Sequence, residues 1–159
     1  MSFEPYVWLK WLHVLSSAVL FGAGLGTAFQ LWSAHRTRKE KAIFVVARTV
    51  VKADWRFTLP AGILQPATGL GLAIVTGTPV NAPWLIVSYV LYLVAFGCWV
   101  PAVMLQIQAR DLAEESVVSG APLRYAYHQA MKRWFVLAWP GFGALVLIFL
   151  LMIAKPQFW

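Results

Sequence analysis

Long apolar runs separated by short polar stretches dominate the chain, and they predict helices that span a membrane. A helix that crosses a hydrocarbon layer about 30 Å thick needs about 20 apolar residues. Four segments reach that length: 7–32, 57–77, 83–107 and 134–154. Only residues 78–82, which include a proline, separate the second span from the third, so these two spans should be antiparallel neighbours. We therefore expect an all-α, four-helix transmembrane bundle that forms a single domain over residues 1–159.

The composition agrees with a chain whose solvent is lipid. Hydrophobic residues make up 60% of the 159 positions and charged residues only 12%, whereas about a quarter of a soluble domain is charged. The net charge of +7 does not indicate a nucleic-acid partner, because the basic residues crowd between apolar runs. Cys98 is the one cysteine, so the sequence predicts neither a disulfide nor a thiolate metal cluster.

The Lys and Arg residues indicate how the spans are oriented, because translocation disfavours basic loops next to span ends. Of the 13 Lys and Arg residues, all except Lys10 and Lys155 lie between the first and second spans or between the third and fourth. Both connections are therefore predicted to be cytoplasmic. The two termini then lie on the non-cytoplasmic side.

The first connection has the pattern of an amphipathic helix, with basic residues on one face and apolar residues on the other. The basic face holds Lys41, Arg48, Lys52 and Arg56, and the apolar face holds Ile43, Val46, Ala47 and Val50. We predict an interfacial helix in the inner headgroup layer, where each basic residue near anionic lipid contributes on the order of 1 kcal/mol. The alternative is one long helix over residues 40–77, but Pro60 and the candidate cap Thr58 favour a break.

His13 is an ionisable residue within the first span, and such a residue usually turns towards a partner or a cavity. Helical spacing places it on one side with Ser17 and Gly24, in a stripe of small and polar residues expected to face the bundle interior. One interpretation is that His13 donates a hydrogen bond to another helix. The other is that the stripe forms a groove for a flat ligand and that the neutral imidazole binds a metal, with haem iron as the preferred candidate.

Two other spans offer partners for such a groove. Gln65 lies in the middle of the second span beside Pro66, which frees a backbone carbonyl, so the Gln65 amide can satisfy that group or face a cavity. Tyr89 and Tyr92 of the third span are candidates for a second axial ligand. The sequence contains no HxxxH or HExxH pattern, which disfavours a zinc hydrolase.

An alternative candidate site lies near the inner surface. His35 ends the first span and His128 precedes the fourth, so the two histidines share a membrane depth and could form a pair. Asp54 lies among basic residues beside the second span. It is either a surface ion pair or helix cap, or a proton or cation site at the cytoplasmic mouth of the bundle. Trp99, close to Pro101, is expected to pack at a kink and not to line a site.

Several short motifs, taken together, resemble an uncharacterised family of bacterial predicted integral membrane proteins. They are WLKWLHVL at 8–15, RTVVKADW at 48–55, LPA at 59–61, QPATG at 65–69, LQIQARDLA at 105–113 and LMIAKP at 151–156. The resemblance runs almost from end to end of the chain. It implies a multi-pass protein of the bacterial inner membrane and, with the orientation above, periplasmic termini.

More distantly, the WLKxxH pattern before a glycine-rich helix, with a proline followed by Thr-Gly in the second span, is similar to HemJ-type protoporphyrinogen oxidases and CopD-type membrane domains. That similarity implies haem b at His13, with His35 near the position of another family histidine. We therefore predict a redox-associated protein that binds haem b or a quinone between its helices, as part of a membrane oxidoreductase system. The alternatives are a non-catalytic accessory subunit, with other membrane subunits or a second copy as partners, and, ranked lower, a small transporter.

Overall fold

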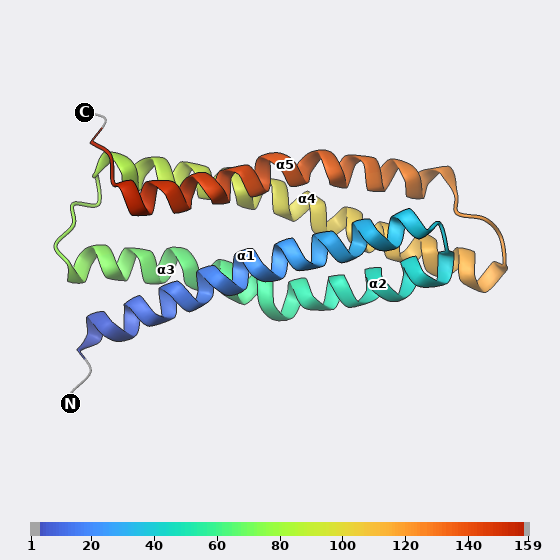
Figure 1. The fold of residues 1–159 in the computed structure, drawn as a ribbon, viewed down its shortest axis with the longest axis horizontal. Coiled ribbons are helices and arrows are strands. Elements are labelled where there is room, and N and C mark those ends of the chain that lie inside the picture. Colours follow the sequence, from blue (N-terminus) through green and yellow to red (C-terminus); the bar gives the residue numbers. More distant parts are fainter. Residues whose placement is uncertain (1–3, 158–159) are drawn as a thin grey trace.

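The computed structural model describes residues 4–157, and nearly all of them are helical (Figure 1). The helices are α1 (Pro5–Thr37), α2 (Glu40–Ala53), the π-helical segment η1 (Asp54–Thr58), α3 (Leu59–Val75), α4 (Pro83–Ser119) and α5 (Tyr125–Ala154). Because α2, η1 and α3 follow one another without interruption, they form one long helix. The result is the predicted all-α bundle, with four helices long and apolar enough to cross a membrane.

The bundle has two distinct ends (Figure 1). We call the end at which α1 meets α2 and α4 meets α5 the basic end, and the end at which α1 begins and α5 ends the terminal end. The α4 helix has 37 residues, and at about 1.5 Å per residue it is much longer than a hydrocarbon layer is thick. It ends at Ser119 and is capped by Gly120, whose φ of 69° is the left-handed conformation that glycine adopts without strain. Helices α1 and α4 both extend past the predicted spans at the basic end.

The expected break between the amphipathic helix and the second span is wrong. Residues 40–75 form one helix, which runs along the bundle axis and does not lie across it as an interfacial helix would (Figure 1). Pro60 is accommodated because the chain widens into the π-helical turn just before it, in which the Leu59 N–H bonds to the Asp54 carbonyl. The apolar face of α2 packs against α1 and α4, so protein and not lipid covers it.

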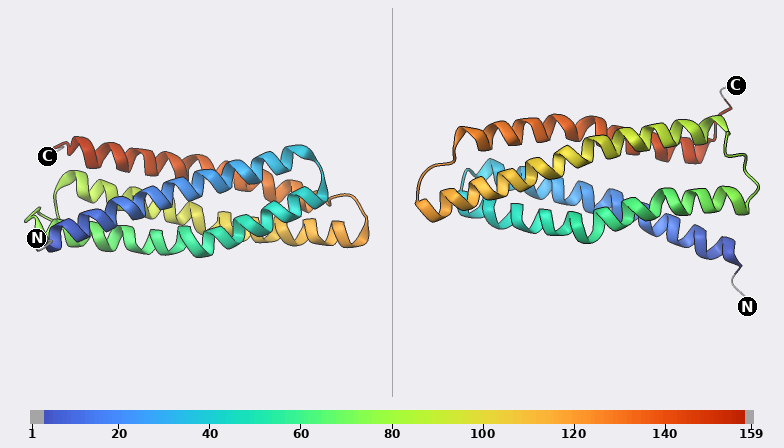
Figure 2. Two further views of the ribbon diagram at one scale, coloured as in Figure 1. Left: turned by 60° about the horizontal axis from the view of Figure 1, so that its bottom comes forward. Right: turned by 180° about the vertical axis from the view of Figure 1, so that it is seen from behind.

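The helices pair as two hairpins, α1 with α2 and α3, and α4 with α5 (Figure 2). Contact between α2 and α4 joins the two hairpins at the basic end. The core there consists of Leu31, Ala34, Ile43, Ala47, Val50, Ala109, Ala113, Tyr127, Met131 and Trp134. A smaller cluster near the terminal end holds Ala73, Trp84 and Leu85. Between these two clusters the helices separate enough to leave a cavity.

Candidate ligand-binding pocket between the helices

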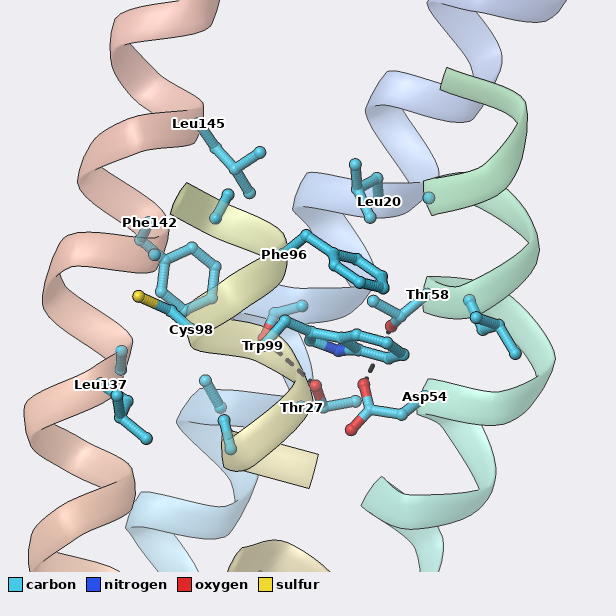
Figure 3. Close-up of a pocket in the computed structure, with 18 of the residues that line it drawn as sticks. Leu20, Thr27, Asp54, Thr58, Phe96, Cys98, Trp99, Leu137, Phe142 and Leu145 are labelled. Carbon is cyan, nitrogen blue, oxygen red and sulfur yellow. Dashed lines mark hydrogen bonds between the residues drawn. The ribbon is translucent and has the colours of Figure 1, made fainter. Parts of the chain in front are cut away.

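A pocket of about 420 Å³ lies in the middle of the bundle and takes lining residues from every long helix (Figure 3). Most of its wall is apolar, with Leu20 from α1 and Phe142 from α5 among the lining side chains. Three lining residues are also well exposed: Ile63 of α3 at 63%, and Leu93 and Phe96 of α4 at 69% and 48%. The pocket therefore opens between α3 and α4, on a surface that would face lipid.

One end of the pocket is polar and centres on Asp54 (Figure 3). The Thr58 hydroxyl, one turn along the same helix, donates to Asp54 Oδ1 at 2.9 Å. With the amide of Gln106 oriented to satisfy its neighbours, its nitrogen donates to Asp54 Oδ2 at 2.6 Å and its oxygen accepts from Trp134 Nε1 at 3.1 Å. All four side chains are buried. This chain of hydrogen bonds ties η1 to α4 and α5 across the bundle.

Trp99 of α4 adds a buried donor to the same end. Its indole lies between Phe96 and the Asp54 carboxylate in the view of Figure 3. The indole nitrogen is buried and its N–H faces the Asp54 carboxylate, with which it interacts, but no acceptor in residues 4–157 meets both the distance and the angle of a hydrogen bond. The expectation that Trp99 only packs at a kink is wrong, because its side chain lines the pocket.

His13 lies in a separate polar network between α1 and α3. Its Nδ1 is 2.9 Å from the Thr68 hydroxyl, and its Nε2 is 3.4 Å from the Gln65 amide nitrogen. The Ser16 hydroxyl is 2.5 Å from the Gln65 amide oxygen. The ring also packs closely on α3, since a Cβ added to Gly69 would lie 3.2 Å from His13 Cε1.

These partners define which nitrogen of His13 carries the proton. The Thr68 hydroxyl already donates to the Leu64 carbonyl at 2.6 Å, so it accepts from His13 Nδ1–H. The Gln65 amide oxygen accepts from Ser16, so the amide nitrogen donates to His13 Nε2. The ring is a neutral imidazole that bridges two helices, and neither of its nitrogens is without a partner.

The other residues predicted for the groove are divided between several places. Gly24 and Tyr92 line the central pocket, where Gly24 faces Phe142 and the Tyr92 hydroxyl donates to the Gly62 carbonyl. Tyr89 packs near the terminal-end cluster, and its buried hydroxyl has no partner within residues 4–157. Ser17 bonds to the Val14 carbonyl of its own helix.

The inner-face site is brought together only in part. His35 Nδ1 is 3.0 Å from the Tyr127 hydroxyl, and the rings of His35 and His128 are 6.1 Å apart. Asp54 does not join them but lines the central pocket. It is also no surface ion pair, because it is only 3% exposed and its hydrogen-bond partners are Thr58 and Gln106.

Sequence reasoning missed four residues of the polar end: Thr58, Trp99, Gln106 and Trp134. The spacing of Asp54 and Thr58, one helical turn apart, is the one local signal that could have shown that their side chains interact. Gln106 and Trp134 lie at the ends of the predicted spans 83–107 and 134–154, and only the packing of α4 and α5 turns them inward.

The fold and its buried polar networks define a multi-pass integral membrane protein built as a four-helix bundle. The chain belongs to the family described as "Predicted integral membrane protein (DUF2269)", whose model matches residues 7–156. No curated protein and no solved structure matches the chain. The resemblance to an uncharacterised membrane family is therefore confirmed, whereas the more distant similarity to HemJ-type and CopD-type proteins has no support in these comparisons.

Proposed function

We propose that the central pocket binds the ring of a quinone and that the protein has a redox-associated role in its membrane. The observation that carries the proposal is the buried indole N–H of Trp99, a residue that lines an apolar pocket: it faces the Asp54 carboxylate but has no acceptor in hydrogen-bonding geometry among the described residues. A buried donor without an acceptor costs about 1–3 kcal/mol. A carbonyl oxygen of a bound ring would supply the acceptor once the indole turns its N–H towards the pocket, because the nitrogen is buried in the present structure.

The shape and polarity of the pocket also support this ligand class. A volume of about 420 Å³ lies within the usual range for small-molecule sites, which are mostly apolar with a few polar groups that fix orientation. The opening between α3 and α4 suits a ligand that arrives from lipid. Asp54, a carboxylate that accepts only two hydrogen bonds here, retains acceptor capacity for a quinol hydroxyl.

Binding of decylubiquinone to the purified full chain tests the proposal, with affinity measured by titration calorimetry in detergent. Trp99→Phe removes the donor but keeps an aromatic ring, so we expect about fivefold weaker binding, the usual worth of one neutral hydrogen bond. Trp139→Phe is the matched control, because Trp139 is 70% exposed and does not line the pocket.

Two results would reject quinone binding. One is equal affinity in Trp99→Phe and Trp139→Phe. The other is equally tight binding of decylbenzene, which carries a similar tail but no carbonyl oxygen. Either outcome would favour the alternatives of an accessory subunit or a small transporter, since neither requires a free donor in the pocket.

Haem b at His13 stays a prediction. The imidazole would have to release the Gln65 amide before its Nε2 could bind iron, because both ring nitrogens are hydrogen-bonded. The close packing of the ring on Gly69 adds a second constraint. These contacts are the reason for preferring a quinone in the central pocket.

A further inference from the structure

A second cavity, of about 300 Å³, lies between α2 and α4 towards the basic end. Its lining residues are Phe44, Arg48, Val51 and Lys52 of α2 with Arg110 and Glu114 of α4. It shares no residue with the central pocket. Three cationic side chains and one carboxylate therefore surround a cavity large enough for a small charged group.

The cations of this cavity are only partly neutralised. Arg110 pairs with its neighbour Asp111 at 2.6 Å. Neither Arg48 nor Lys52 forms an ion pair with any acidic side chain in residues 4–157, and Glu114 lies across the cavity on the other helix without a salt bridge to them. The cavity thus retains a positive charge that an anion can balance.

The depth of the cavity identifies the source of that anion. Trp55 and Phe57, 54% and 55% exposed, mark the start of the lipid-facing part of the second span. Lys52 precedes Phe57 by about a turn and a half, roughly 8 Å along a helix axis. On the other wall, Arg110 follows the predicted end of the third span at residue 107. Both walls therefore place the cations at the level of lipid phosphates.

We propose that this cavity binds the phosphate group of an anionic phospholipid, with Arg48, Lys52 and Arg110 as its cationic contacts. The binding chemistry is that of a phosphodiester against guanidinium and ammonium groups. Phe44 and Val51 supply the apolar part of the wall. The site is independent of the quinone proposal, because it uses other residues in another cavity.

Native mass spectrometry of the detergent-purified full chain, titrated with phosphatidylglycerol, tests the site. The double variant Arg48→Gln, Lys52→Gln should bind this lipid about thirtyfold more weakly, at roughly fivefold for each basic residue. The matched control Lys41→Gln, Arg56→Gln removes the same charge from exposed positions on the same long helix outside the cavity, and it should bind close to wild type. Glu114→Gln should bind more tightly, a gain that a misfolded protein would not produce.

Phosphatidylcholine and inorganic phosphate complete the experiment. Weak binding of the zwitterionic lipid and no displacement by phosphate at equal concentration are the expected results. Equal losses of phosphatidylglycerol affinity in the two double variants would show that the lipid binds to the basic surface in general and not to the cavity, which would overturn the proposal. Tight binding of phosphatidylcholine, or displacement by inorganic phosphate, would also overturn it, the latter in favour of a site for free phosphate.

Discussion

His13 and Asp54 are both ionisable residues among apolar helices, and the bundle accommodates them by different means. Both ring nitrogens of His13 form hydrogen bonds with side chains of one neighbouring helix. Asp54 instead receives one donor on each carboxylate oxygen, from its own helix and from α4. The hydrogen bonds of His13 therefore hold two helices together, whereas the Asp54 carboxylate, in the wall of the central pocket, can accept further hydrogen bonds.

Replacing His13 with alanine should destabilise the protein. The change leaves Thr68 and the Gln65 amide nitrogen without their partner, at a cost near the lower end of about 1–3 kcal/mol because the site is only half-buried. The midpoint of thermal unfolding in detergent should fall by several degrees. Ser17→Ala on the same helix is the control and should leave the midpoint nearly unchanged, since Ser17 bonds only to its own helix.

A visible spectrum of the same preparations tests haem binding. If His13 ligates iron, protein expressed with ample haem should show a Soret band that shifts on reduction. His13→Ala should lose this band, while His35→Ala and His128→Ala, which lie at the basic end, should keep it. A colourless wild-type protein would leave His13 as an interhelical hydrogen-bond donor.

The sequence identified unusual residues better than it identified their partners. His13 and Gln65 were each anomalous within an apolar span, and the structure joins them. The partners of Asp54 could not be predicted, because Gln106 and Trp134 belong to helices far along the chain and reach it only through tertiary packing. The basic residues near Asp54 in sequence pointed to an ion pair, but the helix turns them away from its buried side.

Among the elements, α1 and α3 approach each other closely because α3 carries glycines at the contact. A Cβ on Gly69 would lie 3.2 Å from His13, and one on Gly71 would lie 3.3 Å from Leu9. Between membrane helices, where lipid is as apolar as the side chains, such close contact supplies much of the association energy.

Gly69→Leu should therefore separate α1 from α3 and lower the thermal unfolding midpoint substantially. Gly97→Leu is the matched control: it adds the same side chain to another helical glycine, but one with no atom near its missing Cβ. Because a leucine side chain is as apolar as lipid, a difference in unfolding midpoint between the two variants reports helix packing and not hydrophobicity. Equal midpoints in detergent would contradict the importance of this contact.

The number of spans follows from apolar length, so the sequence predicted four, and the structure has four helices long and apolar enough to cross a membrane. The sequence prediction failed at the junction of α2 and η1, because proline in an isolated helix favours a break. Two features outside local sequence preserve the helix there. The π turn makes room for Pro60, and the buried face of α2 is held against α1 and α4.

At the scale of the whole molecule, the two hairpins meet firmly at the basic end and enclose the central pocket nearer the middle. The proposed phosphate cavity lies between α2 and α4 towards the basic end, on the side of α4 that faces the long α2–α3 helix. Both proposed sites thus lie at the interface between the two hairpins.

The orientation of the bundle in the membrane is the last prediction, and it rests on charge. The start of α1 and the C-terminal end of α5 lie together at the terminal end of the bundle (Figure 1). The basic connections lie at the opposite end. We propose that the basic end is cytoplasmic and that both termini are periplasmic in a bacterial inner membrane. A reporter fused after Trp159 should then read as periplasmic and one inserted near Ala121 as cytoplasmic, with neutralisation of Arg36, Arg38, Lys39 and Lys41 weakening the preference. The reverse readout would refute this orientation.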